Sequence, residues 1–371
     1  LEQDFPNASI RPGDLNDIAL AVREIRESLP VVTQEIGDSW IHGAATDPRK
    51  MSQYRALLRL RKGWTGAPRE TADRWLINIP EHTWGLDYKT YLKDYGHFVR
   101  SEFEAVRGTP AYQRMEASWD EQRGYLRGLV DELSGEEKNQ AEQAMEEYCL
   151  PPVDCARLQK LPDPQAPHSK NGWEVTFDGT GAICRLSFQG KLLADQDHRL
   201  GVFRYEAFSR KETDRFCGQY IDLSQFPELG PLAVDDFNKL GAETAISAYK
   251  CCGTKLTALY GQEEGWLAVL QVEDAEALEQ YGCPRFLALQ VQALPDRLAL
   301  DLAWWAKPAT RVPEGLWLGM SPLAGGCKIQ KLGQLVDPQD MVSCGGRPLH
   351  GPEGGVRYDG GLSVETPVTA P

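Results

Sequence analysis

The spacing of apolar residues changes once along this chain, and the change limits the folds that the chain can adopt. Between residues 14 and 148, apolar side chains recur every three or four positions, a spacing that predicts amphipathic helices. From residue 173 onward they alternate with polar ones, as Trp173, Val175 and Phe177 do, which predicts strands with one buried face. Helices followed by strands in a chain of 371 residues predict an α+β protein of several domains.

Two of the helices can be located by the residues that begin them. Asp14 follows Pro12-Gly13 and can cap a helix that ends near Pro30. Asp47 and Pro48 fit the cap and first position of another helix, because proline lacks the N–H donor that this position leaves unused. The apolar stripes on these two helices are Leu15, Ile18, Val22, Ile25 and Leu29, and Met51, Tyr54, Leu57, Leu58 and Leu60.

A proline-rich segment, 149–172, separates the helical part from the extended part and predicts a linker. Beyond it, a turn at 178–181 joins two alternating runs, which predicts an antiparallel hairpin. The same alternation returns at 287–291 and 298–304. The second half therefore predicts a large antiparallel sandwich.

Charge and composition argue against two kinds of partner. The net charge of −14 disfavours duplex nucleic acid, because phosphate binding needs a concentrated lysine and arginine surface. No run approaches the roughly 18 apolar residues of a membrane span. A neutral substrate fits the charge better, and the nine scattered cysteines, without a C-x-x-C pair, predict mostly buried free thiols.

Three segments of the sequence carry a resemblance to a known family: TQEIGDSWIHGAATDPRKMSQYRALLRLRKGW (33–64), PEHTWG (80–85) and GGRPLHGPEGGVRYDGGLSVET (345–366). In their order along the chain they resemble the rear two-thirds of the retaining α-mannosidases of glycoside hydrolase family 38. They are also similar, nearly end to end, to the domain-of-unknown-function group numbered 5054.

The resemblance implies an architecture for each part of the chain. Residues 1–46 would be the last element of a (β/α) barrel, 47–150 a helical bundle of the three-helix type and 151–172 a linker. Residues 173–371 would form a mutarotase-like β-supersandwich, expected to be incomplete. In such enzymes the catalytic carboxylates lie on earlier barrel strands, which would precede Leu1. The chain is therefore expected to be a fragment without turnover of its own, taken from a zinc-dependent retaining glycosidase.

His82 is the metal ligand that the resemblance implies. The mannosidases bind zinc through barrel residues and a histidine from a bundle hairpin of the pattern QHHDAVTGT, and His82 in PEHTWG matches the second histidine. Glu81 and Thr83 depart from that pattern, since they replace the first histidine and the sugar-contacting aspartate. The alternative for His82 is a hydrogen-bonded structural imidazole.

Four further residues are candidates for binding sugar. Asp38 matches an aspartate in the strand-end loop that shapes the mannosidase sugar site, and Glu35 can face the same cleft. Asp38 can instead accept backbone amides in a tight turn. Trp40 and Trp84 can stack on a pyranose ring or lie in the core. The alternative function for the whole chain is a non-catalytic carbohydrate-binding or structural module.

Overall fold

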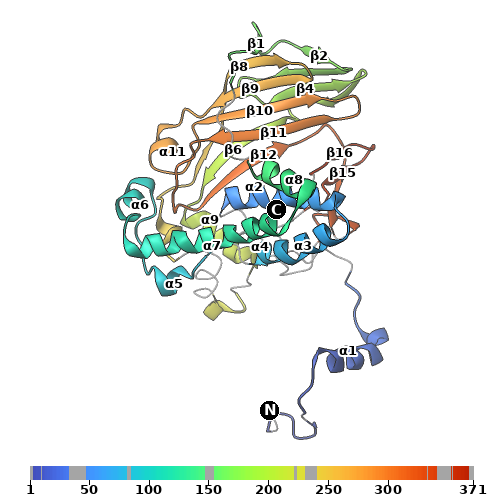
Figure 1. Ribbon diagram of the computed structural model, residues 1–371, viewed down its shortest axis with the longest axis vertical. Coiled ribbons are helices and arrows are strands. Elements are labelled where there is room, and N and C mark those ends of the chain that lie inside the picture. Colours follow the sequence, from blue (N-terminus) through green and yellow to red (C-terminus); the bar gives the residue numbers. More distant parts are fainter. Residues whose placement is uncertain are drawn as a thin grey trace.

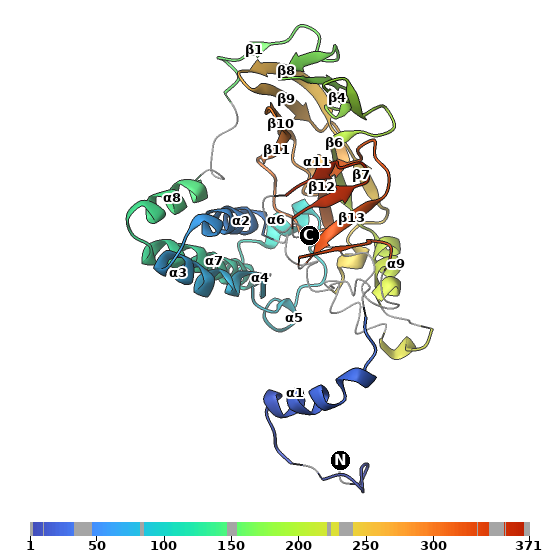
Figure 2. The ribbon, with the colours of Figure 1, turned by 90° about the vertical axis from the view of Figure 1, so that its right-hand side faces the viewer.

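The computed structural model of the chain is an α+β protein in which the helices between residues 48 and 146 form a layer apart from the sheets of the second half (Figures 1 and 2). It describes residues 3–9, 11–32, 47–81, 85–146, 154–220, 224–229, 240–331, 333–340, 352 and 354–366. The predicted α+β class, with helices first and antiparallel sheets second, is confirmed. The predicted barrel element is not tested, because residues 33–46 lie outside the described ranges.

The helical layer is formed mainly by α2 (Pro48–Gly63), α3 (Ala67–Leu76), α7 (Pro110–Glu132) and α8 (Gly135–Glu146). Shorter helices complete it: α4 (Asn78–Glu81), α5 (Tyr88–Tyr91) and α6 (Arg100–Val106). Leu57, Leu76, Leu126 and Leu129 are almost fully buried in one cluster between the long helices. Burying these apolar faces against one another holds the layer together.

The first helix, α1 (Leu15–Glu24), begins where the sequence predicts and has no buried residue. Asp14 caps it, accepting from the backbone N–H groups of Asn16 and Asp17, and Asp17 returns a bond to the Asp14 N–H. The helix ends earlier than predicted, at Glu24, and a 3-10 turn follows at Arg26–Ser28. Figures 1 and 2 both show α1 standing apart from the helical layer and the sheets.

Two antiparallel sheets face one another across the second half of the chain. The first has the order β1-β8-β9-β10-β11, with bounds Gln159–Lys160, Lys255–Gln262, Gly265–Gln271, Phe286–Ala293 and Leu298–Trp305. The second has the order β12-β6-β4-β3-β2, with bounds Glu314–Met320, Leu200–Ala207, Ile183–Phe188, Trp173–Phe177 and His168–Lys170. β5 (Lys191–Ala194) pairs with β4, and β7 (Lys250–Cys252) pairs with β6.

The core between the two sheets is continuous. Phe177 and Leu186 from one sheet and Leu259 and Leu289 from the other belong to a single buried cluster. The predicted hairpin is confirmed as β3 and β4, and its turn ends at Gly181 with φ 87°. A Cβ at Gly181 would lie 2.2 Å from Leu270 Cδ2 of the facing sheet, so both the backbone angle and the sheet packing require glycine there.

Smaller elements complete the second half. A four-stranded sheet has the order β14-β13-β15-β16, with bounds Gln334–Val336, Cys327–Lys331, Val356–Tyr358 and Ser363–Val364. Two helices, α9 (Arg210–Tyr220) and α11 (Ala275–Glu279), lie between strands. Within the described ranges, no helix has both the length and the apolar character that crossing a bilayer requires. The segment predicted to be a linker contributes strands β1 and β2.

Candidate functional site

All five residues singled out from the sequence, Glu35, Asp38, Trp40, His82 and Trp84, lie outside the described residues. The structure therefore does not test whether they meet. It does describe Asp47, where the chain resumes after the first of these segments, and Gly85, where it resumes after the second. The contacts of these two residues show where the two segments are attached.

Asp47 is attached to α7 by a partly buried ion pair. One carboxylate oxygen, Oδ1, accepts from the Lys50 backbone N–H at 3.1 Å, which makes Asp47 the predicted N-cap of α2. The other oxygen, Oδ2, lies 2.7 Å from Arg123 Nε of α7. Asp47 is only 7% exposed, whereas the Arg123 side chain is 28% exposed, so the pair is partly shielded from water.

Lys50 adds a second charged contact to the same helix. Its side chain is 1% exposed, and Nζ donates to Gln122 Oε1 of α7 at 2.8 Å. Burial lowers the pKa of the Lys50 ammonium, while attraction to Asp47 raises it in part. A buried lysine is costly unless it is bonded, so this contact fixes the first turn of α2 against α7.

Gly85 meets α7 one turn earlier. The backbone N–H of its neighbour, Leu86, donates to Ser118 Oγ at 3.0 Å. A Cβ at Gly85 would lie 2.1 Å from Ser118 Oγ and 2.5 Å from Trp119 Cδ1. The backbone at Gly85 therefore approaches α7 more closely than any side chain would allow.

These contacts converge on one side of α7. Ser118, Trp119, Gln122 and Arg123, which we call the α7 anchor face, are two adjacent pairs that stand three to five positions apart, so they lie on neighbouring turns of the same helical side. The full span from Ser118 to Arg123 is about 7.5 Å along the helix axis. Asp47 and Gly85, the first described residues after the segments 33–46 and 82–84, are thus held against the same short stretch of α7.

The described residues supply no metal-binding set of their own. Among them, no three histidine, cysteine, aspartate or glutamate side chains gather as ligands. The zinc that the resemblance implies therefore finds no donor set in the part of the chain that the structure describes.

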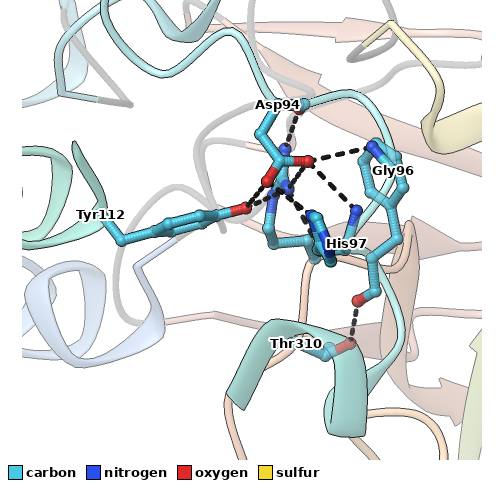
Figure 3. A network of polar contacts seen from close by, with 7 residues as sticks. Asp94, Gly96, His97, Tyr112 and Thr310 are labelled. Atoms are coloured by element: carbon cyan, nitrogen blue, oxygen red, sulfur yellow. Dashed lines mark hydrogen bonds and ion pairs between the residues drawn. The ribbon is translucent and has the colours of Figure 1, made fainter. Parts of the chain in front are cut away.

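A second polar network joins the helical layer to the sandwich (Figure 3). Asp94, in the turn between α5 and α6, accepts from the backbone N–H groups of Gly96 and His97 at 3.0 and 3.1 Å. Its Oδ2 also accepts from the Tyr112 hydroxyl at 2.8 Å and lies 2.7 Å from His97 Nδ1. Arg311, from the loop between β11 and β12, lies 3.4 Å from Asp94 Oδ1.

Arg311 has further contacts across this junction. It donates to the Asp94 backbone carbonyl at 2.7 Å and to the Tyr112 hydroxyl at 2.6 Å, and its guanidinium lies 4.5 Å above the Phe98 ring. Phe98 is itself buried in the core of the sandwich. An open depression of about 510 Å³, lined by Tyr95, His97 and Tyr112 among others, lies beside the network.

Part of the Asp94 geometry is a local turn. Asp195 and His198, in the turn between β5 and β6, repeat the same spacing, with His198 Nδ1 at 2.8 Å and the His198 N–H at 2.9 Å from Asp195 Oδ1. An aspartate-histidine contact therefore arises from turn geometry alone and does not identify a catalytic pair. What distinguishes Asp94 is the addition of Tyr112 and Arg311 from distant elements. The turn itself was readable in the Asp94-Tyr95-Gly96-His97 sequence, although we did not predict it.

We expect Asp47→Ala to destabilise the protein by on the order of 3 kcal/mol, because it removes a cap and leaves the buried Lys50 ammonium and the partly buried Arg123 guanidinium without their carboxylate. Asp87→Ala is the matched control. Asp87 caps α5 through Lys89 N and Thr90 N, and losing such a cap should cost about 1 kcal/mol. Urea unfolding of both variants checks this, and equal losses would contradict the role given to the ion pair.

The pH dependence of stability should reveal the Asp94 junction. Burial raises the pKa of Asp94, but its hydrogen bonds with Gly96, Tyr112 and His97 outweigh this and hold it well below the usual range. The folded pKa is thus below the unfolded value of about 3.9, so the stabilisation is present at neutral pH and is lost as pH falls below about 5. Asp94→Asn should cost on the order of 2 kcal/mol at pH 7, and this deficit should shrink toward pH 3.

Asp195→Asn is the control for that measurement. Among the described residues, the hydrogen-bond partners of the Asp195 side chain all lie in its own turn. Its substitution should therefore have a smaller effect at pH 7, as measured by urea unfolding across the same pH series. A deficit for Asp94→Asn that stays constant with pH would show that the carboxylate does not hold the junction.

Comparison with known sequences covers the contacts described above but not Glu35, Asp38 or Trp40. The family model described as Domain of unknown function (DUF5054) matches residues 44–298. The match includes Asp47, Gly85 and the α7 anchor face, and it ends before the glycine-rich segment 345–366. The sequence matches no curated protein. Since the matched range covers more than half of the 371 residues, the chain belongs to the family described as Domain of unknown function (DUF5054).

Proposed function

We propose that this chain is part of a carbohydrate-active protein, a metal-dependent retaining glycoside hydrolase resembling the α-mannosidases of family 38. In this proposal the chain contributes the bundle hairpin and the β-sandwich, and a (β/α) barrel outside its 371 residues contributes the catalytic carboxylates. The observation that carries the proposal is the attachment of both mannosidase-like segments to the α7 anchor face. A site assembled from two loops needs such a common support.

Each candidate residue has a role in this proposal. His82 supplies one zinc ligand, and the remaining ligands come from the barrel. Asp38 and Glu35 bind sugar hydroxyls, and Trp40 and Trp84 stack on the apolar face of a pyranose. Bound zinc would orient the sugar hydroxyls, while one carboxylate attacks the anomeric carbon and the other protonates the leaving oxygen. The described residues only hold the segments that carry these side chains.

A neutral sugar is a suitable ligand for a protein that carries a net negative charge. A net charge of −14 repels anionic ligands, whereas a glycoside carries no charge to be repelled. Polar groups at the start of α2 also suit a site that must keep its geometry. The buried Asp47 and Lys50 bond to Arg123 and Gln122 of α7, which limits the movement of the first turn of α2.

The test uses the protein in which a barrel precedes this chain, assayed on aryl α-mannosides with and without a chelator. His82→Ala should lower kcat/KM and bound zinc by at least ~100-fold, since even outer-shell residues of metal sites cost 10–100-fold. His198→Ala, in a sandwich turn, is the matched control and should leave both unchanged. Activity that is unchanged both by the chelator and by His82→Ala would refute the metal role.

A non-catalytic glycan-binding module is the second candidate, and one observation favours it. Trp317 on β12, an edge strand of its sheet, is 47% exposed and offers an aromatic face on the sandwich. Glycan binding by the 371-residue chain that survives His82→Ala but is lost in Trp317→Ala would support this reading. Phe286→Ala, which removes another exposed aromatic ring (49%), controls for a general loss of apolar surface.

A further inference from the structure

A depression opens at the end of the sandwich where the edge strands β1 and β2 of the two sheets lie (Figure 1). Its volume is about 640 Å³, and its lining comes from both sheets. Gln159, Gly261 and Trp266 line it from the first sheet, and His168 and Lys170 line it from the second. A space of this size is within the range of small-molecule sites.

A glycine leaves part of this space unfilled. A row of paired residues crosses the first sheet: Gln159, Gly261, Trp266 and Val291. Residues paired in this way point to the same face of a sheet, and the fully buried Val291 identifies that face as the inner one. Gly261 has no side chain to fill its place in the row. A Cβ there would lie 3.7 Å from Leu161 Cδ2, so the described packing would also accept a side chain.

The indole N–H of Trp266 is a donor without an acceptor at this depression. Trp266 is 4% exposed, yet its N–H donates to no acceptor among the described residues. In that part of the chain, the fully enclosed side-chain atoms without a partner are Trp75 Nε1 and Thr176 Oγ1, so the Trp266 N–H keeps access to open space. Trp173, by contrast, donates from Nε1 to Leu294 O at 2.7 Å. Since a buried tryptophan N–H normally has a partner, a ligand in the depression can supply it.

Two cations line the same depression. Lys170 Nζ donates to the carbonyl oxygens of Gln262 and Glu263, both at 2.6 Å, which leaves one of its three N–H donors. Arg157 is exposed beside it, and neither cation forms an ion pair with a carboxylate in the part of the chain that the structure describes. In a chain with 54 acidic and 40 basic residues, two such cations at one depression suit an anionic group.

We propose that this depression binds a sugar acid, a small ligand that carries one carboxylate and several hydroxyl groups. The ligand carboxylate accepts charge-assisted hydrogen bonds from Lys170 and Arg157. One ligand hydroxyl accepts from the Trp266 N–H, and another donates to the Glu263 carboxylate, which also lines the depression. The carboxylate of Glu263 disfavours a ligand with a second negative charge.

The net charge of the chain does not prevent such binding. The charge of −14 repels an anion at long range, but salt limits this repulsion to about 8 Å at physiological ionic strength. Within that distance, Lys170 and Arg157 determine the sign of the local potential. None of the residues used here takes part in the proposed hydrolase or in the exposed face at Trp317, so the binding site and those functions can fail separately.

The experiment titrates the full chain with glucuronate and with glucose, followed by ligand-observed NMR. Glucose has a neutral hydroxymethyl group where glucuronate has its carboxylate. Glucuronate should bind, and glucose should bind at least ~10-fold more weakly, because it loses the charge-assisted bonds. Methyl glucuronide distinguishes two sources of the same chemistry. It binds like glucuronate if the site takes the end of a glycan, and it binds more weakly if the site takes the free acid.

Filling the depression tests its location. Gly261→Leu should abolish glucuronate binding, because the new side chain occupies the space beside Trp266. Gly319→Leu on β12 is the matched control, since a Cβ there would lie 3.5 Å from Val202 O, again in ordinary contact. This control should bind glucuronate as the wild type does. Melting temperatures of both variants check that they are folded.

Removing the cations tests the chemistry of recognition. Lys170→Gln should weaken glucuronate binding by about 10-fold, and Arg157→Gln by about 5-fold, since Arg157 is exposed. Lys255→Gln is the control for charge alone, because Lys255 on β8 is ion-paired with Glu273 at 3.0 Å, and it should leave binding unchanged.

Three results would each overturn the proposal: equal binding of glucose and glucuronate, no binding of glucuronate at millimolar concentration, or glucuronate binding that survives Gly261→Leu. If Gly261→Leu does not fold, Arg157→Gln decides in its place. Arg157 is exposed, so its substitution should not disturb the fold. Unchanged affinity in Arg157→Gln and Lys170→Gln would then overturn the assignment of the carboxylate to this depression.

Discussion

The contact of Arg311 with Asp94 and Phe98 holds the two halves of this protein in a fixed relation. The helices bury their apolar faces mainly against one another, and the sheets have a core of their own. Phe98 and Val99 are exceptions, since Phe98 lies in the core of the sandwich and Val99 packs against it. Arg311 covers the Phe98 ring and ion-pairs with Asp94, so one sandwich residue fixes both the apolar and the charged parts of the junction.

Helix α7 extends the effect of this junction to the candidate site. Tyr112 near its start bonds to both Asp94 and Arg311, and Ser118 to Arg123 form the anchor face that holds Gly85 and Asp47. Tyr112 and Arg123 are eleven residues apart, about 16 Å along a continuous helix. Since a helix resists bending over this length, the sandwich keeps a constant separation from Asp47 and Gly85. The β-sandwich can thus contribute to the site by orienting α7.

The features that the sequence predicted well, helix caps and a hairpin, depend on contacts between residues close together in the chain. Asp14 and Asp47 were recognisable as caps because a cap bonds to amides two or three residues on. The β3–β4 hairpin was recognisable because alternation and a four-residue turn are local signals. The break between α5 and α6 was not predicted, although it too has a local signal, since Asp94 accepts from its own following amides, those of Gly96 and His97.

What the sequence could not show depends on distant contacts. Lys50 looks like a surface residue of an amphipathic helix, and only its contact with Gln122, 72 positions away, explains its burial. The domain boundaries and the roles of His82 and Asp38 remain predictions, because they came from a resemblance between segments.

The anchor face shows which part of that resemblance has a physical basis in the described structure. A family pattern can persist because its residues bind a ligand or because they hold the fold. Asp47, in the first family-like segment, and Gly85, in the second, both meet α7, and each is explained by contacts within the chain. These two positions therefore need no substrate to account for them. The anchor face supports the proposed sugar site by holding its two segments on one helix, and among the residues proposed to contact a ligand His82 is the one that a metal measurement can isolate.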